Sequence, residues 1–323
     1  MTAHLPRSLG IILVGAFFAV SQAQAQKYPS QDLHFIAAFP PGSGADILVR
    51  YYAEAIRPLA GRTIIVENKP GANGLIAMET LVRAKPDGHT LHPTAGVAPA
   101  VTLALYNSYT IDPEKQLQIA ATLSRQPYMI AVHSSTPYKT LADLTAVLKQ
   151  KGDKGTYGQS NLGSLVVAEM YKTVMGLPTV RVDYKSGPDA VNDLSSGALD
   201  FFSADPILGA SMARKGEWRI LALSSAERVK AMGDLPTLKE QGIDVDITAW
   251  WGVFASKATP KPVIDQINKW FVEAVGSEKT KTFLAQFGGD PLIETPEAGT
   301  ARMLRDIKNW AEYVRVAKLK KLD

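Results

Sequence analysis

The chain has 323 residues, of which 46% are hydrophobic and 20% charged, so it can bury the core of one or two globular domains and is not expected to be disordered. Its net charge is only +4, and its basic and acidic residues are interspersed. This pattern argues against a nucleic-acid-binding surface, which gathers basic residues in a patch. The absence of cysteine excludes thiol catalysis, cysteine zinc sites and disulfides.

Residues 1–25 have the pattern of a signal peptide. A polar start with one cation, Arg7, precedes an uncharged apolar run over 9–20, and A-Q-A at 23–25 supplies the small-x-small cleavage site. An uncleaved anchor or a buried strand is the alternative, but the run is shorter than the roughly twenty residues of a membrane span. We predict cleavage after Ala25 and export of the mature chain, which in a Gram-negative cell means the periplasm.

Short β-rich runs alternate with helical patterns along the mature chain, which predicts α/β layers with largely parallel sheets. The expected strands are His34–Phe39, Thr63–Asn68, Thr90–Thr94, Gln118–Leu123, Met129–Val132, Thr156–Gly158, Val180–Tyr184, Phe201–Ala204, Arg219–Ser224 and Trp250–Ala255. The expected helices are Ala45–Ala60, Leu75–Lys85, Leu141–Lys151, Leu162–Met175, Pro188–Ser196, Pro262–Val275 and Pro296–Val316.

A first glycine-bearing loop, F-P-P-G-S-G-A-D at 39–46, lies between an expected strand and an expected helix. Glycines allow close approach of a ligand to the backbone, and the free N–H groups of a helix start attract an anion. The predicted anion-binding residues are Gly42, Ser43, Gly44, Ala45 and Asp46. The alternatives are an ordinary loop in which Asp46 caps the helix, or a dinucleotide site, whose fingerprint is broken at Ile47.

A second loop, Y-G-Q-S-N-L-G-S at 157–164, has the same strand-to-helix position. Ser160, Asn161 and Ser164 offer side-chain donors and N-capping oxygens, and Gly163 lies among them. The run resembles the hydrolase motif G-x-S-x-G but has one residue too many after the serine. All five histidines precede Ser160, so a Ser-His-Asp enzyme in the α/β-hydrolase order is excluded, whereas other orders stay open.

One close histidine pair, His89 and His92, falls on an expected strand. A spacing of three puts the two rings on opposite faces of a strand, and no further ligand accompanies them at metal-binding spacing. The pattern favours a structural role beside the strand over a metal site. We expect neither a metal nor a cofactor.

Several motifs together resemble one known family. F-P-P-G-S-G-A-D (39–46), V-E-N-K-P-G-A-N-G (66–74) and K-P-D-G-H-T-L (85–91) are similar to the N-terminal signature of Bug-type solute receptors, which serve tripartite tricarboxylate transporters. The similarity continues through Y-G-Q-S-N-L-G-S, V-D-Y-K-S, G-A-L-D-F, W-R-I-L-A-L-S-S, D-L-P-T-L-K-E-Q-G and A-T-P-K-P-V, in the same order and over nearly the whole mature chain.

The resemblance implies a two-lobed type II periplasmic-binding-protein fold that holds a small ligand in the cleft between its lobes. It places the lobe boundaries so that 26–125 and 249–323 form lobe 1 and 126–248 forms lobe 2. In the family, the loops matching 39–46 and 160–164 hold one ligand carboxylate from opposite lobes. The resemblance also implies docking on the membrane permease subunits of a tripartite transporter, or on a sensor.

The sequence departs from the family pattern in three places. Ser43 separates two glycines that are usually adjacent, so a positive-φ position has moved. Asp205 is shifted by one residue and is either a ligand contact or a helix N-cap. The run from Thr94 is less polar than usual, which favours an aromatic acid if Phe39 and Tyr184 lie nearby; ordinary core packing is the alternative for both rings.

Two further segments receive structural interpretations. V-E-N-K-P-G (66–71) is interpreted as a turn that fixes lobe 1 rather than a contact surface, and one of the tryptophans at 250–251 is expected to pack at the hinge.

The sequence therefore predicts a monomeric, non-enzymatic periplasmic receptor for a small carboxylate, with a dicarboxylate or an aromatic acid favoured. An exported hydrolase of small esters and an envelope interaction protein without a small ligand are the alternatives.

Overall fold

A computed structural model describes residues 28–107, 110–184 and 187–321. The predicted signal peptide lies outside these residues. Within the described ranges, no helix combines the length and the apolar character needed to cross a membrane.

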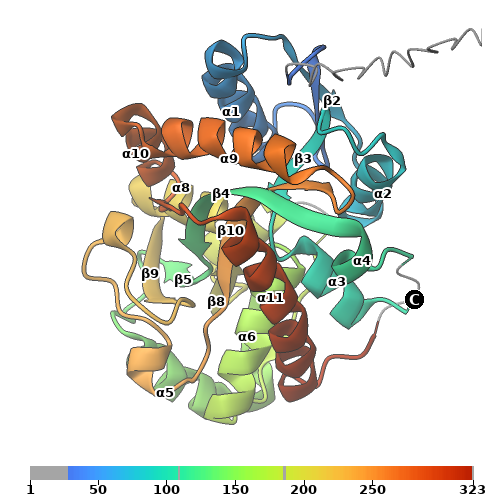
Figure 1. Cartoon of the computed structure of the whole chain (residues 1–323). Helices are drawn as coiled ribbons and strands as arrows, with labels where there is room; N and C mark the ends of the chain where they lie inside the picture. Colours follow the sequence, from blue (N-terminus) through green and yellow to red (C-terminus); the bar gives the residue numbers. More distant parts are fainter. Residues whose placement is uncertain (1–27, 108–109, 185–186, 322–323) are drawn as a thin grey trace, which may run out of the picture.

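The first of two sheets has six strands in the order β11-β4-β10-β3-β1-β2. The strands are β1 Leu33–Ala37, β2 Ile64–Asn68, β3 Thr90–Ala95, β4 Leu117–Pro127, β10 Thr248–Ser256 and β11 Asp290–Pro291. The helices grouped with this sheet are α1 Gly44–Ala60, α2 Leu75–Arg83, α3 Ala98–Leu105, α4 Pro113–Gln116, α9 Lys261–Gly276, α10 Glu278–Ala285 and α11 Pro296–Val316 (Figure 1).

The second sheet has five strands in the order β7-β6-β8-β5-β9. They are β5 Met129–His133, β6 Thr156–Gln159, β7 Val180–Arg181, β8 Phe201–Ala204 and β9 Trp218–Leu223. The helices grouped with it are α5 Leu141–Lys151, α6 Leu162–Met175, α7 Gly187–Ser196 and α8 Pro206–Arg214. Four short 3₁₀ helices complete the described structure: η1 Ala72–Gly74, η2 Gly152–Lys154, η3 Lys230–Met232 and η4 Lys239–Gln241.

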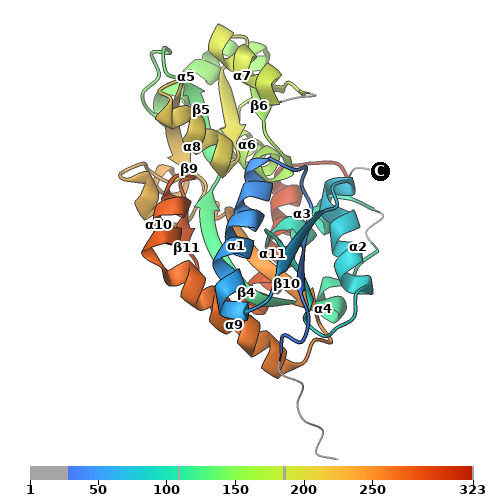
Figure 2. The same cartoon turned by 90° about the horizontal axis from the view of Figure 1, so that it is seen from above.

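The two sheets form the two lobes of a mixed α/β fold, and Figure 2 shows the second group of elements stacked beyond the first. The chain leaves the first sheet where β4 is followed by β5, and it returns at β10. β4 ends at Pro127 and β10 begins at Thr248, whereas the predicted crossings fall after 125 and 248. The exact lobe boundaries stay a prediction.

The expectation of largely parallel sheets is wrong. β1 is parallel to β2 and β3, and β6 is parallel to β7 and β8, but the other pairings among the named strands are antiparallel. The physical reason is the double crossing. Helical crossovers within a lobe produce parallel neighbours, whereas the crossing strand β4 and the returning strand β10 run in opposite directions and pair with each other.

Most predicted elements agree with the structure to within a few residues, but α3, α4, α8, α10 and β11 were not predicted. The clearest reason applies to α3, whose sequence A-P-A-V-T-L-A-L is apolar around most of its circumference and is largely buried. A helix buried on nearly all sides carries no apolar stripe, so its sequence lacks the helical period.

Trp250 anchors the returning strand to the C-terminal helix. Its ring is buried, and its Nε1 donates a hydrogen bond of 2.6 Å to Asp306 Oδ2 on α11. Gly96 makes room for the ring, because a Cβ at that position would lie 2.2 Å from it. Burial raises the pKa of the Asp306 carboxyl to about 6, although the Trp250 donor and Arg302 act in the opposite direction.

We predict that Asp306→Asn stabilises the protein at neutral pH. Because the pKa of Asp306 is higher in the folded state than in the unfolded state, its favourable contribution is present below about pH 4 and is lost as the pH rises through about 6. Asparagine keeps an acceptor for Trp250 and does not ionise. The variant's advantage in free energy of unfolding should therefore grow over this interval to about 2–3 kcal/mol, measured by urea denaturation from pH 4 to 8. A pH-independent difference would contradict the assignment.

Candidate functional site

A cavity of about 560 Å³ lies where the two predicted loops meet, a volume in the usual range for small-molecule sites. The first sheet and its connections contribute residues from 38–40, 70–78 and 92–102, and the second lobe contributes Asn161, Leu162 and Gly163. Tyr128, between β4 and β5, lines it as well. The cavity is therefore bordered by both lobes and by one of the crossings.

The start of α6 borders this cavity. Asn161 is the N-cap, and its side chain accepts a hydrogen bond from the Ser164 amide, while Ser164 Oγ accepts from the amides of Ser160 and Asn161. The amides of Leu162 and Gly163 have no acceptor among the described residues, and both residues line the cavity. Such orphan donors are left at every helix start, and here they belong to residues that border a ligand-sized space.

The start of α1 is organised by a buried carboxylate. Asp46 accepts hydrogen bonds from the Gly42 amide (2.8 Å), Arg50 Nε (2.9 Å) and Asn68 Nδ2 (2.7 Å). Burial by itself would raise the pKa of Asp46, but the donors from Arg50, Asn68 and Gly42 outweigh it and hold the pKa below its usual value. Asp46 is thus saturated by the protein and shapes the loop.

Glycine is required at position 42 of this loop, where φ is +79°. Ser43 caps α1 by accepting from the Asp46 amide, and the Ser43 amide donates to Pro40 O. The amide of Ala45 has no acceptor in the described structure.

Most of the lobe 1 wall of the cavity is apolar. Phe39 packs against Trp251, with ring centroids 5.8 Å apart, and Met78, Val97 and Val101 extend the wall. None of the described residues that line the cavity is Asp, Glu, Lys or Arg. An anion in this space must therefore be held by backbone amides and neutral side chains.

The structure brings together only some of the predicted site residues. Phe39, Thr94, Asn161 and Gly163 line the cavity. The remaining predicted residues, which lie outside this lining, are Gly42, Ser43, Gly44, Ala45, Asp46, Ser160, Ser164, Tyr184 and Asp205. Direct ligand contact by any of these residues stays a prediction.

Two of the outlying side chains have clear structural partners. Tyr184 Oη donates to Asp193 Oδ2 at 2.8 Å. Asp205 is the N-cap of α8 and accepts from the amides of Ile207 and Leu208, which matches the capping alternative.

Sequence reasoning missed several lining residues. His92 and Tyr128 line the cavity, as do Pro70 and Gly71 of the segment interpreted as a turn only. That segment does fix lobe 1, because Asn68 Nδ2 donates to Phe39 O, but its last residues also form part of the cavity wall. The pattern at 66–74 gave no signal for this role, since the proximity of η1 to the cleft is a tertiary feature.

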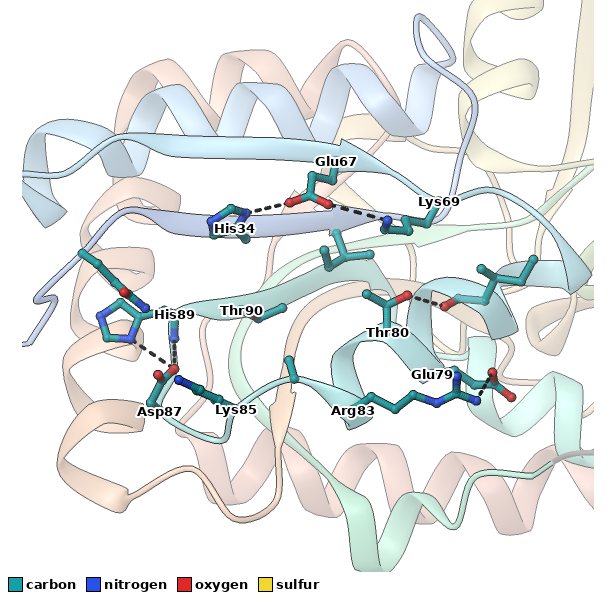
Figure 3. Close-up of a pocket in the computed structure, with 14 residues that line it drawn as sticks. His34, Glu67, Lys69, Glu79, Thr80, Arg83, Lys85, Asp87, His89 and Thr90 are labelled. Carbon is teal, nitrogen blue, oxygen red and sulfur yellow. Dashed lines mark hydrogen bonds and ion pairs between the residues drawn. The ribbon is translucent and has the colours of Figure 1, made fainter.

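A second hollow of about 610 Å³ lies on lobe 1 between β1, β3 and α2 (Figure 3). Its charged groups pair largely with each other. Glu67 contacts His34 and Lys69, Arg83 pairs with Glu79, and His89 pairs with Asp87. It includes neither of the two glycine-bearing loops, and we therefore place the candidate site in the cleft.

Comparisons with known proteins identify the family of this chain. The model of the tripartite tricarboxylate transporter family receptor, TctC, matches residues 48–321. The chain belongs to the TctC family. Members of this family are periplasmic solute receptors rather than enzymes. The family resemblance inferred from the motifs is thereby confirmed.

Individual relatives cover almost the whole receptor. Protein BugT of Bordetella pertussis is 28% identical over 96% of this chain and 98% of its own length. The structure of periplasmic binding protein BugD superposes with a TM-score of 0.76 at 27% identity, covering 91% of this chain and all (100%) of BugD. The structure of R. palustris Rpa4515 with adipate has a TM-score of 0.79 at 24% identity, covering 91% and 100% of the two chains, and shows the shared fold.

We predict that Gly163→Ala disrupts the α6 start of this TctC-family receptor. An added Cβ would lie 2.1 Å from Oη and 2.4 Å from Cζ of the buried Tyr128, so either the ring or the loop must move. The expected loss is about 1–3 kcal/mol in the free energy of unfolding, measured by chemical denaturation. Gly276→Ala is the matched control, because its Cβ would meet only Ile293 Cδ1 at 3.9 Å. Equal stabilities of the two variants would refute the packing argument.

We also predict that Asp46→Asn weakens the receptor at neutral pH. The amide loses the charge that binds Arg50 and can satisfy only part of the network, at a cost of about 1–3 kcal/mol. Because the pKa of Asp46 is lower in the folded state, the wild-type advantage is present above the unfolded-state pKa and fades as the pH falls through the folded-state pKa. Denaturation curves between about pH 3 and pH 7 measure this. Asp265→Asn, at an exposed pair with Lys261, should change little.

Proposed function

We propose that this protein is a periplasmic receptor that captures a small carboxylate and delivers it to a tripartite tricarboxylate-type transporter or to a sensor. The observation that carries the proposal is the pair of unpaired amides, of Leu162 and Gly163, that border a cavity without charged lining. The family to which the chain belongs consists of receptors of tripartite tricarboxylate transporters. The signal-peptide pattern of residues 1–25, with predicted cleavage after Ala25, supports export.

The energetics of backbone capture are sufficient. Taking a carboxylate out of water costs several kcal/mol unless it is hydrogen-bonded. Hydrogen bonds to a charged group contribute about 1.5–3 kcal/mol each, and the dipole of α6 adds about 0.3–1 kcal/mol. Two amides at one helix start therefore offset the desolvation of one carboxylate without a cationic side chain.

The cavity wall favours one of the two predicted ligand classes. A second carboxylate would meet no Lys or Arg among the described lining residues, whereas Phe39, Met78 and Val101 suit an apolar body. An aromatic or otherwise apolar acid therefore fits this wall better than a dicarboxylate does. The lobes are expected to close on the ligand by rotation about the two crossings.

A thermal-shift screen tests the proposal directly. The protein, freed of co-purified ligand by unfolding and refolding, is screened against aromatic monoacids, aliphatic dicarboxylates, tricarboxylates and amino acids. An acid at 100 times its Kd should add about 2.7 kcal/mol of stability, and we expect the largest shifts from aromatic acids. The neutral amide of each hit is the control, since it lacks the anion that the α6 amides would bind.

No shift with any acid, in protein shown to be folded by circular dichroism, would overturn the carboxylate assignment. Equal shifts from an acid and its amide would overturn the role of the α6 start while leaving the receptor assignment in place.

A further inference from the structure

His92 is a buried polar residue in the cavity lining. It lies on β3 within the first sheet, its side chain is 1% exposed, and it lines the space next to Thr94. Its Nδ1 is 2.5 Å from the backbone oxygen of Ile36 on β1. The ring is therefore fixed by the neighbouring strand.

This contact determines where the ring carries its proton. A carbonyl oxygen can only accept, so Nδ1 must be the donor, and in the neutral ring Nε2 then carries the lone pair. Burial lowers the pKa of His92 to about 4, although the bond to Ile36 acts in the opposite direction, so the ring is neutral at pH 7. None of the described residues donates a hydrogen bond to Nε2, and this atom keeps some accessible surface.

The other polar side chains of the cavity are less restrictive. Hydroxyl groups such as those of Thr94 and Tyr128 rotate and can either donate or accept, and the Asn161 amide offers both kinds of group. Nε2 of His92 can only accept. An acceptor that a bound ligand shields from water without offering a donor is costly, so a ligand that lacks a donor at this point binds less well.

We propose that His92 makes the receptor selective for carboxylates that carry an uncharged hydrogen-bond donor, such as a hydroxyl group, on the body of the ligand. This inference rests on the proposed function and narrows its ligand class. The carboxylate is held at the start of α6, the apolar body lies against the lobe 1 wall, and the donor group reaches Nε2 of His92.

Matched ligands test the proposal on the unmodified protein. Benzoate is compared by calorimetry with its 2-, 3- and 4-hydroxy derivatives and with the corresponding methoxy derivatives, which keep the oxygen but lose the donor. Succinate, malate and methoxysuccinate form the aliphatic series. We expect at least one hydroxy acid to bind about tenfold more tightly than both its parent and its methoxy derivative, the size expected of one hydrogen bond.

A variant pair tests the residue itself. In His92→Asn the side-chain amide can still donate to Ile36 O, but the distal acceptor is lost. We expect the preference for the hydroxy acid over its parent to fall to less than about twofold. His133→Asn removes a partly exposed histidine outside the cavity and should keep the full preference.

A spectroscopic measurement covers the case in which His92→Asn does not fold. In wild-type protein labelled with ¹⁵N, the unprotonated Nε2 resonance of His92 should shift on binding the preferred hydroxy acid and not on binding its parent. Acids that bind equally with and without the donor, or an Nε2 resonance that is unmoved, would overturn this proposal alone. Failure of every acid to bind would instead overturn the proposed function.

Discussion

The binding capacity proposed for the cleft depends on which backbone N–H groups of two loops are already hydrogen-bonded within the protein. A helix start leaves several N–H groups unpaired, and a nearby acceptor in the protein can consume them. At α6, Ser164 and Asn161 accept from three amides of the loop, and those of Leu162 and Gly163 stay available. At α1, Asp46 accepts from the Gly42 amide, and Ser43 accepts from the Asp46 amide. The capping side chains thus decide which amides remain unpaired and available to a ligand.

Because the chain crosses twice between the lobes, residues of both lobes line the same cavity. β4 leads through Tyr128 into the second sheet, and β10 returns to pair with β4 and β3. Tyr128 packs so closely on Gly163 that no side chain fits between them. The α6 start is therefore held against the crossing, where it borders the cavity of the candidate site.

Neutrality is the second constraint on the cleft. Asp46 of the first loop is paired with Arg50, and the described cavity lining contributes no formal charge. In such an environment a ligand is distinguished by hydrogen-bond direction and shape more than by total charge. In our proposal, the fixed tautomer of His92 distinguishes ligands that can donate a hydrogen bond to Nε2 from those that cannot.

Local sequence determined much of this protein. The strand and helix periods predicted most elements, and the loops at 39–46 and 157–164 were located because glycine and capping residues act over a few positions. Tertiary structure decided the rest. The apolar helix α3, the antiparallel crossing strands and the roles of His92, Tyr128 and Pro70 depend on neighbours distant in sequence. His92 became a cavity residue because β3 lies beside β1, where Ile36 orients its ring, and no spacing within the segment itself encodes that contact.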